Sequence, residues 1–419
     1  MSFSSFALDK ALTDAVKSLG YTEPTPIQIK AIPAILAKKD LMAGAQTGTG
    51  KTAAFALPIL QMLGEKLPNH RPVRALVLTP TRELAQQVYK NFVGYAENTE
   101  LNVAVAYGGV SINPQIAALN KGADVLVATP GRLLDHLING SLALTELECL
   151  VFDEADRMLD MGFKDEIDRI LNRVPVKRQT LLFSATFDDA IFKLSKNLLN
   201  DPLLIEIGER NTAAEKVEQI VYTVDLDRKR ELTSFLIGSK NWQQVLIFTR
   251  TKQGADVLAK EMCKDGIKTQ SIHGDKSQGA RERALAEFKA GKTRALVATD
   301  VAARGIDIHD LNVVINYELP YVAEDYIHRI GRTGRAGNEG LAISLMSPSE
   351  TWLLEAVEEV LDSRLMQQWL PGYEPDLTKT EAVMKKISKG KEKQRARKKA
   401  FGEQPSKSKA RNKPSNRRR

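Results

Sequence analysis

The chain has few of the residues on which several structural classes depend. Its 419 residues include only two cysteines and five histidines. Cys149 and Cys263 are far apart and neither has metal-ligand spacing, so we expect two buried free thiols in a reducing compartment, not a disulfide or a metal site. No apolar run approaches the ~20 residues of a membrane-spanning helix. The first ten residues lack a basic segment followed by an apolar run, which predicts no secretory signal and a cytoplasmic protein.

Charge of both signs is plentiful but unevenly placed. The sequence contains 60 Lys or Arg and 52 Asp or Glu, for a formal net charge of +8. Residues 385–419 hold 16 of the basic residues and two of the acidic ones, so this tail carries +14 and residues 1–384 carry −6. The tail cannot bury enough apolar surface to offset its ordering entropy, which predicts disorder. A basic tail indicates a polyanionic partner, and a merely solubilising terminus is the alternative.

Short apolar runs alternate with amphipathic segments along the rest of the chain. The runs cover residues 75–79, 125–128, 149–152, 180–183, 244–248, 295–298 and 313–315. Runs of this length fit strands that are buried on both faces of parallel sheets, with helices between them. We therefore predict α/β domains at 1–208 and 217–365. The polar stretch 209–216 is the predicted linker, and 366–419 the extension with the basic disordered tail.

A glycine-rich segment stands between a strand candidate and the start of a helix. After residues 40–43, the sequence reads Ala45-Gln46-Thr47-Gly48-Thr49-Gly50-Lys51-Thr52. Glycines let backbone N–H groups wrap phosphate oxygens, and a helix N-terminus adds positive potential. Lys51 would reach the β- and γ-phosphates of ATP, and the Thr52 hydroxyl would ligate Mg²⁺. The alternative is a chance Lys-Thr after a glycine-rich turn, and the flanking elements argue against it.

An acidic tetrapeptide follows another apolar run. Asp153-Glu154-Ala155-Asp156 comes directly after residues 149–152. Ligands of α/β proteins bind at the carboxyl ends of parallel strands. Asp153 would therefore hold Mg²⁺ through water, and Glu154 would orient or deprotonate the attacking water. Acidic clusters at helix starts are usually caps. About a hundred residues after a phosphate loop, however, the same tetrapeptide indicates nucleotide hydrolysis.

Further motifs follow in a fixed order. They are Gly20–Gln28, Pro80–Ala85, Gly108–Gly109, Thr129–Arg132, Ser184–Thr186, Leu246–Thr251, His273–Asp275, Gln278–Arg281, Ala298–Asp307 and Tyr326–Arg335. Each string alone would be an ordinary turn or helix cap. Together with the phosphate loop and the acidic tetrapeptide, they resemble the DEAD-box RNA helicases of superfamily 2, most closely the short bacterial members of the RhlE type. The resemblance covers residues 3–345.

This resemblance implies two tandem RecA-like domains and an ATP-driven RNA helicase. It implies that Gln28 hydrogen-bonds the adenine edge, that Phe3 stacks on the adenine ring, and that Asp307 contacts the ribose. Arg332 and Arg335 resemble two arginine fingers aimed at the γ-phosphate. Surface ion pairing is the alternative for these arginines, but two Arg three residues apart on a glycine-rich turn fit an anion site better.

The resemblance also implies contacts with the RNA backbone. Their residues would be Thr81, Arg82, Gly109, Thr129, Arg132 and Thr299. Hydroxyls, glycine N–H groups and arginines can hold phosphates without reading bases. Such contacts would select single-stranded RNA through its phosphates and 2′-hydroxyls. The segment Ser184-Ala185-Thr186 resembles the element that links hydrolysis to strand separation.

The sequence thus predicts that ATP and RNA together close the cleft between the domains and complete the catalytic site. Hydrolysis would separate short duplexes or remodel RNA–protein complexes, and ribosome assembly and RNA decay both suit the resemblance. Two other functions remain open. A DNA translocase on the same fold is disfavoured by the acidic tetrapeptide and by Gln28. A non-hydrolysing, ATP-gated RNA clamp is disfavoured by the presence of Lys51, Glu154 and both arginines.

Overall fold

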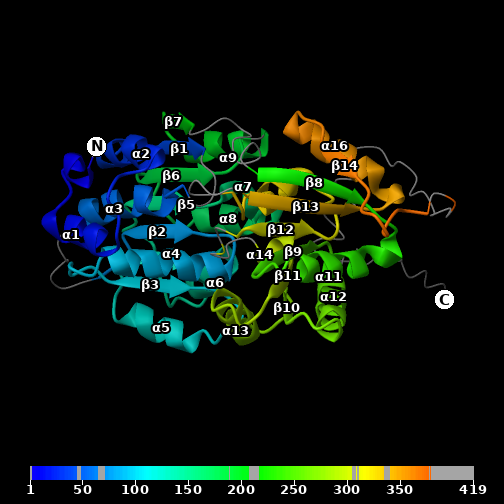
Figure 1. Ribbon diagram of the computed structural model, residues 1–419. Helices are drawn as coiled ribbons and strands as arrows, with labels where there is room; N and C mark the ends of the chain where they lie inside the picture. The colour runs from blue at the N-terminus through cyan, green and yellow to red at the C-terminus, as the bar shows by residue number, and fades with distance from the viewer. Residues whose placement is uncertain are drawn as a thin grey trace, which may run out of the picture.

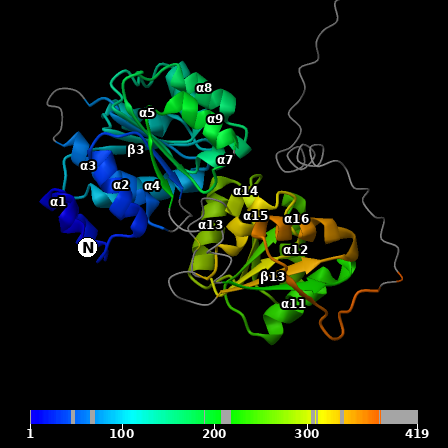
Figure 2. The same ribbon diagram turned by 90° about the horizontal axis from the view of Figure 1, so that it is seen from above.

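Two seven-stranded parallel sheets form the framework of the protein. The computed structural model describes residues 2–44, 49–64, 71–187, 189–206, 217–303, 308, 311–334, 340–376 and 378. Within these residues each domain contains one sheet, and the two domains lie side by side (Figure 1). A view from above shows them as two lobes, with α1 (Lys10–Ser18) at the end farthest from the second domain (Figure 2). The predicted pair of α/β domains is confirmed.

The first sheet has the strand order β3-β4-β2-β5-β6-β1-β7. Its strands are β1 (Leu41–Gly44), β2 (Ala75–Leu78), β3 (Val103–Ala106), β4 (Val125–Ala128), β5 (Cys149–Phe152), β6 (Gln179–Ser184) and β7 (Leu203–Glu206). Every neighbouring pair is parallel. All residues of β2, β4, β5 and β6 are buried. That burial on both faces explains why these strands are continuous apolar runs in the sequence.

Helices cover both faces of the first sheet, because alternate residues of each strand point to opposite sides. Ala75 and Val77 enter a core with α1 to α4, whereas Leu76 and Leu78 enter a core with α6 to α9. The remaining helices of this domain are η1 (Phe3–Phe6), α2 (Pro26–Leu36), α3 (Lys51–Leu63), α4 (Arg82–Tyr95), α5 (Asn113–Asn120), α6 (Pro130–Ile138), α7 (Ala155–Asp160), α8 (Lys164–Leu171) and α9 (Asp189–Leu198).

The second sheet has the order β10-β11-β9-β12-β13-β8-β14. Its strands are β8 (Val217–Thr223), β9 (Val245–Thr249), β10 (Thr269–Ile272), β11 (Ala295–Thr299), β12 (Val313–Asn316), β13 (Gly340–Met346) and β14 (Met366–Gln368). The helices are η2 (Leu226–Arg228), α11 (Lys229–Ser239), α12 (Lys252–Lys264), α13 (Gln278–Lys289), α14 (Asp300–Ala303), α15 (Glu324–Ile330), η3 (Pro348–Glu350) and α16 (Thr351–Leu361). One face packs against α11 and α12, and the other against α13 to α16.

Hydroxyl side chains begin three helices that border the region between the domains. Thr81, Thr251 and Ser277 are the N-caps of α4, α12 and α13, and each accepts a hydrogen bond from a backbone N–H in the first turn. Such caps satisfy donors that the helix itself leaves unpaired. The caps therefore fix where these helices start, immediately after the strand ends.

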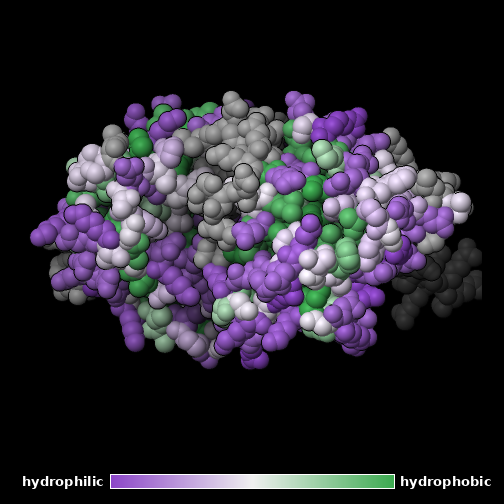
Figure 3. Space-filling view, viewed as in Figure 1, coloured by the Kyte–Doolittle hydropathy of each residue, from purple (hydrophilic) through white to green (hydrophobic). Residues whose placement is uncertain are grey.

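The strands predicted from apolar runs agree with the structure to within one residue at each end. The predicted linker at 209–216 and the basic tail at 385–419 lie outside the described residues. β14 belongs to the second sheet although it follows residue 365. None of the helices in the described part of the chain is long and apolar enough to cross a membrane. Hydrophilic side chains dominate the face seen in Figure 3, and hydrophobic ones gather near the junction of the domains.

One prediction about the cysteines is wrong. Both are free thiols, and Cys149 is buried in β5, but Cys263 is exposed. The buried face of α12 is made by Ala255, Leu258, Ala259 and Met262. Cys263 follows Met262 directly, so the helical period turns it toward solvent.

Candidate functional site

Three strand ends of the first sheet bring together the residues predicted to bind ATP phosphates. β5, β6 and β1 are neighbours in the sheet. Asp153 follows the end of β5, Ser184 ends β6, and Lys51 begins α3, the helix after β1. Because the strands are parallel, their carboxyl ends lie at one edge, where α/β proteins bind ligands. The topology thus places the phosphate loop and the acidic tetrapeptide along the same part of this edge.

Lys51 and Asp153 are buried charges with unmet hydrogen-bonding capacity. Their exposed fractions are 6% and 3%. Among the residues that the structure describes, neither Lys51 Nζ nor Asp153 Oδ1 has a hydrogen-bond partner. Burial raises the pKa of the Asp153 carboxyl to about 6, and the Lys51 ammonium opposes this shift. Burying a charged group without such partners costs free energy, so the pair indicates a site that a polar ligand completes.

Two residues with positive φ border this pair of charges. Gly50 is the N-cap of α3 with φ of 89°, and a Cβ there would lie 2.5 Å from Nε2 of Gln28. Only glycine combines that conformation with that close approach. Glu154 has φ of 56° between β5 and α7 and is 7% exposed. A non-glycine residue in the left-handed region is under local strain, which concentrates at functional sites.

Gln28 connects α2 to the start of the phosphate-loop helix. Its Oε1 accepts a hydrogen bond from the Thr25 backbone N–H at 2.9 Å, and its Nε2 donates to the Gly50 carbonyl at 3.1 Å. Phe3 is 6% exposed, and its ring stacks on Tyr21 with centroids 6.5 Å apart. Both residues predicted to recognise adenine are therefore fixed by contacts within the first domain.

Asp156 of the acidic tetrapeptide holds the segment after β6. Its Oδ2 accepts hydrogen bonds from the backbone N–H groups of Ala185 and Thr186 at 3.2 and 3.1 Å. The Thr186 hydroxyl donates to the same oxygen at 3.2 Å. The Ser184 hydroxyl donates to the Thr186 carbonyl at 2.7 Å. A movement of the tetrapeptide would therefore be transmitted directly to Ser184-Ala185-Thr186.

Residues predicted to contact RNA lie along the other half of the same edge. β3, β4 and β2 are neighbours, and Gly109, Thr129 and Thr81 follow their ends. Thr129 and Thr81 are 7% and 6% exposed. The first sheet thus separates the predicted sites for its two ligands, and they adjoin between β2 and β5.

Two arginines hold the glycine turn at residues 108–110. Gly109 has φ of 81°, and a Cβ there would overlap the guanidinium of Arg82. Arg132 donates from Nη2 to the Val110 carbonyl at 2.9 Å, and its Nε lies 3.4 Å from Asp135. Arg82, Gly109 and Arg132 are therefore brought together, as expected for residues that share one ligand.

In the second domain, Thr299 ends β11 and Arg332 follows the end of α15. They are 7% and 4% exposed. α15 is anchored by Arg329, whose Nε and Nη2 donate to the Asp300 carboxylate at 2.6 and 2.8 Å and whose Nη1 donates to the Glu318 carbonyl at 2.6 Å. The helix that precedes Arg332 is therefore firmly attached to the sheet.

Side chains of the two domains contact each other through α7 and α15 and through α4 and α13. Arg157 in α7 and Asp325 in α15 form an ion pair at 3.8 Å, and these residues come directly after the acidic tetrapeptide and directly before Tyr326–Arg335. Glu83 in α4 pairs with Arg281 in α13 at 2.9 Å, and Gln278 donates to Glu83 at 3.3 Å. Both contacts connect a predicted motif of one domain with a predicted motif of the other.

Comparison with known families agrees with this geometry. The DEAD/DEAH box helicase family matches residues 25–194, and the helicase conserved C-terminal domain family matches residues 227–337. The chain is 44% identical over 372 residues to the ATP-dependent RNA helicase CshA of Listeria monocytogenes, covering 89% of this chain and 71% of that protein. It belongs to the DEAD-box ATP-dependent RNA helicases. A second member, RhpA of Helicobacter pylori, is 42% identical over 87% of this chain and 73% of its own.

Solved structures of DEAD-box proteins match this chain across both domains, to different degrees. Saccharomyces cerevisiae Dbp5 bound to RNA and ADP-BeF3 is 32% identical, with a TM-score of 0.79 over 88% of this chain and 95% of that chain. A DEAD-box protein from Methanococcus jannaschii is 40% identical, covering 88% of this chain and 99% of its own, with a TM-score of 0.52. The Methanococcus jannaschii protein thus has the more similar sequence of the two but the less similar structure.

Some predicted residues of this DEAD-box protein cannot be placed. Ala45, Gln46, Thr47 and Gly48 of the phosphate loop, Asp307 and Arg335 lie outside the described residues. Conversely, the sequence reasoning passed over Arg157 and Asp325, which join the domains. Each stands next to a recognised motif, but nothing local to either residue reveals a partner so distant in sequence.

Proposed function

We propose that this chain hydrolyses ATP in response to RNA and uses the cycle to separate short RNA duplexes or remodel RNA–protein complexes. The observation that carries the proposal is the buried pair at the sheet edge, since Lys51 Nζ and Asp153 Oδ1 lack hydrogen-bond partners within the described part of the chain. The triphosphate of ATP and its cation would supply these partners. Lys51 holds the β- and γ-phosphate oxygens, and Glu154 orients or deprotonates the attacking water.

Thr52 and Asp153 fit a magnesium ion. Mg²⁺ prefers oxygen ligands and usually keeps several waters, so one hydroxyl and one carboxylate are sufficient protein ligands. The residues described here include no group of three or more His, Cys, Asp or Glu that could hold a metal, which agrees with an ion that arrives with the nucleotide. When bound, Mg²⁺ neutralises negative charge on the phosphate oxygens.

Nucleotide selection is proposed to lie in α2 and η1. Gln28 retains a second N–H and a second acceptor site beyond its contacts with Thr25 and Gly50, enough to hydrogen-bond one adenine edge. Phe3 would stack on the ring through the face that Tyr21 leaves, and Asp307 would contact the ribose. The backbone of residues 45–48 would surround the phosphates.

RNA is proposed to bind along the β3-β4-β2 half of the first edge and the corresponding β10-β11-β9 half of the second. The contacts would come from Thr81, Arg82, Gly109, Thr129, Arg132 and Thr299. Support comes from the juxtaposition of Arg82, Gly109 and Arg132 around one turn. Hydroxyls and guanidiniums in this position bind phosphates of any sequence.

Completion of the catalytic site is assigned to the second domain. Arg332 and Arg335 would stabilise charge on the transferred phosphoryl group, a contribution worth roughly 10³–10⁵ in rate in related systems. The ion pair between Arg157 and Asp325 supports this assignment, because it joins α7 to the helix that leads to Arg332. The greater structural likeness to RNA- and nucleotide-bound Dbp5 supports reading the present domain arrangement as the closed one.

For the remaining parts of the chain, we propose domains at 1–208 and 217–365, with β14 added to the second sheet, and a linker at 209–216.

The tail at 385–419 would add sequence-independent RNA affinity in the cytoplasm, in ribosome assembly or RNA decay. Each phosphate neutralised on a single strand contributes roughly −0.7 to the log–log salt slope. Deleting the tail should flatten the slope measured by titration while ATPase activity at saturating RNA survives; an unchanged slope would contradict this role.

Glu154→Gln tests the catalytic assignment directly. This variant keeps the shape of the side chain but loses the carboxylate, so it should bind ATP and RNA and barely hydrolyse ATP. Binding is measured by fluorescence titration and turnover by phosphate release. Glu97→Gln, an exposed glutamate just after α4, is the matched control and should turn over normally. Near-normal turnover by Glu154→Gln would show that another group orients the water.

The same assay separates RNA from DNA as the activating polymer. Contacts with 2′-hydroxyls predict that RNA stimulates ATP hydrolysis more than DNA of equal length and sequence. Equal stimulation would instead favour a DNA translocase. Binding of ATP and RNA without any turnover would favour a clamp.

A further inference from the structure

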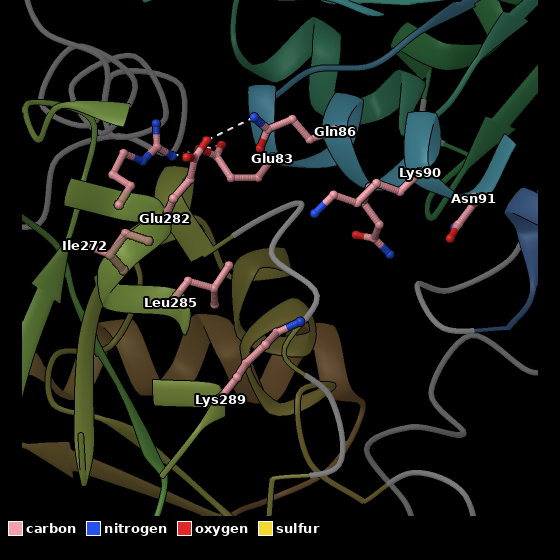
Figure 4. Close-up of a pocket in the computed structure, with 10 residues that line it drawn as sticks. Glu83, Gln86, Lys90, Asn91, Ile272, Glu282, Leu285 and Lys289 are labelled. Atoms are coloured by element: carbon pink, nitrogen blue, oxygen red, sulfur yellow. Dashed lines mark hydrogen bonds and ion pairs between the residues drawn. The ribbon is translucent and has the colours of Figure 1, made fainter. Parts of the chain in front are cut away.

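Beyond the ion pair of Glu83 with Arg281, a second set of contacts joins α4 to α13 (Figure 4). The Gln86 amide nitrogen donates to Glu282 Oε1 at 2.9 Å across the domain boundary, and to the Tyr107 hydroxyl at 2.6 Å within the first domain. An amide nitrogen carries two hydrogens, so one group can make both bonds at once. Gln86 is therefore a junction between three segments of the chain.

Each of the three residues, Gln86, Tyr107 and Glu282, lies directly beside one of the sequence motifs but outside it. Gln86 follows Pro80–Ala85, and Tyr107 precedes Gly108–Gly109. Glu282 follows Gln278–Arg281, and Gln278 donates to its Oε1 at 3.1 Å. The contacts therefore attach the turn that packs against Arg82 to a helix of the opposite domain.

We propose that Gln86 is a positioning residue that couples domain closure to the grip of the first domain on RNA. Its bond to Glu282 forms only when the domains are together, and its bond to Tyr107 fixes the residue before the glycine turn. Closure and RNA binding then favour each other reciprocally. The inference rests on the proposed function, since it assigns Gln86 to the RNA-dependent step of that cycle.

Beyond Gln86, the two helices move apart. Farther along the helices, α4 and α13 separate around a cavity of about 200 Å³ whose lining includes Lys90, Asn91, Leu285 and Lys289. Figure 4 shows these side chains on opposite sides of the opening, while Gln86 reaches Glu282 across it. Loss of the amide would remove one hydrogen bond from the outer part of the boundary.

The decisive measurement is RNA affinity with and without an ATP analogue. In full-length Gln86→Leu, RNA affinity in the presence of ADP-BeF3 should fall about threefold to tenfold, the effect of losing one or two hydrogen bonds of which one is to a charged group. RNA affinity without nucleotide should fall less, because in the open form only the hydrogen bond to Tyr107 is lost. RNA-stimulated ATPase should require correspondingly more RNA, with kcat at saturating RNA retained. Asn91→Leu, on the same helix and the same cavity, is the control and should match the parent protein.

A second variant tests whether Glu282 is the partner. Gln86→Lys retains a donor within reach of the carboxylate and should recover most of the analogue-dependent affinity. In a Glu282→Leu background it should recover none, and Gln86→Leu should then add little further loss, because the two residues act as one pair. Melting curves of all variants should be superimposable, since the pair lies at the surface.

Two results would overturn the inference. Unchanged analogue-dependent RNA affinity in Gln86→Leu would show that the contact contributes nothing to closure. An equal loss with and without nucleotide would show that Gln86 acts within the first domain alone. Both differ from failure of the proposed function, which would be seen as absence of RNA-stimulated ATPase in the unsubstituted protein.

Discussion

The two domains have the same strand order, but charged residues at equivalent positions differ. Within the described residues, Lys51 Nζ and Asp153 Oδ1 of the first domain have no hydrogen-bond partner, whereas Lys229 and Glu318 of the second are paired. Numbered within its own domain, each sheet reads third, fourth, second, fifth, sixth, first, seventh. β1 therefore corresponds to β8, and β5 to β12. The first α-helix after β1 begins with Lys51, and the first α-helix after β8 begins with Lys229. Two lysines thus occupy equivalent positions in the fold.

Their surroundings differ. Lys229 is fully buried and donates to the Leu345 carbonyl at 2.8 Å and to Glu350 at 2.5 Å. Burial lowers the pKa of Lys229, and Glu350 opposes that shift. Lys51 has no such partner. The connection before Lys229 has no glycine to admit a phosphate, whereas the connection before Lys51 contains Gly48 and Gly50.

The acidic positions repeat the contrast. Glu318 follows β12 by two residues, and its carboxylate accepts the Arg250 backbone N–H at 2.7 Å and pairs with the Arg250 guanidinium at 3.2 Å. Asp153, after β5, retains an oxygen without a partner. The difference teaches that burial of charge alone does not mark a ligand site. A ligand site is marked by a buried charge that lacks a hydrogen-bond partner within the protein.

Substitution of Lys51 should have the largest effect on ATP turnover. Lys51→Gln removes the cation that faces the phosphates and should lower RNA-stimulated ATP turnover about 10²–10³-fold, comparable to losing one preorganised donor at a transition state. Its unfolding free energy should fall only slightly, because Lys51 Nζ makes no hydrogen bond among the described residues and only its attraction to the Asp153 carboxylate is lost. Phosphate release and chemical denaturation measure the two quantities. Lys39→Gln, an exposed lysine of the same domain, is the control.

Lys229→Met should have the opposite outcome: it should lower the stability of the protein and leave ATP turnover unchanged. Removing one partner of a buried ion pair costs roughly 3–5 kcal/mol, and the lower end applies because Arg250 still pairs with Glu350 at 2.5 Å. Denaturation should show that loss, while the protein that remains folded hydrolyses ATP at the parental rate. Lys240→Met, at the exposed end of α11, should leave stability unchanged. Equal loss of turnover in Lys51→Gln and Lys229→Met would refute the contrast between the domains.

Most of the fold was predictable because buried parallel strands are continuous apolar runs. The run at residues 149–152 gave β5 with its correct bounds. The exposure of Cys263 was missed because the cysteine was judged by its residue type and not by its place in the period of α12.

The sequence could also predict which short motifs share a sheet edge, but not what satisfies each charge there. Lys51 and Lys229 are both lysines at the start of a helix. Only the structure pairs Lys229 with Glu350, which is 121 residues away in the chain. Local sequence patterns do not predict contacts between the domains either, such as that of Gln86 with Glu282. The residues involved look like any others on the surface of a helix.

The smallest effect sharpens the comparison at the acidic position. Asp153→Asn removes a buried negative charge whose Oδ1 has no hydrogen bond, so in the absence of nucleotide it should raise the unfolding free energy by on the order of 1 kcal/mol. The same change removes the carboxylate proposed to hold Mg²⁺ and should abolish ATP turnover. Glu318→Gln is the counterpart in the second domain and should lower stability, because its charge is paired with Arg250. If denaturation showed Asp153→Asn to be destabilising, the Asp153 charge would already be compensated within the protein, and the reasoning that assigns the ligand site to the first domain would fail.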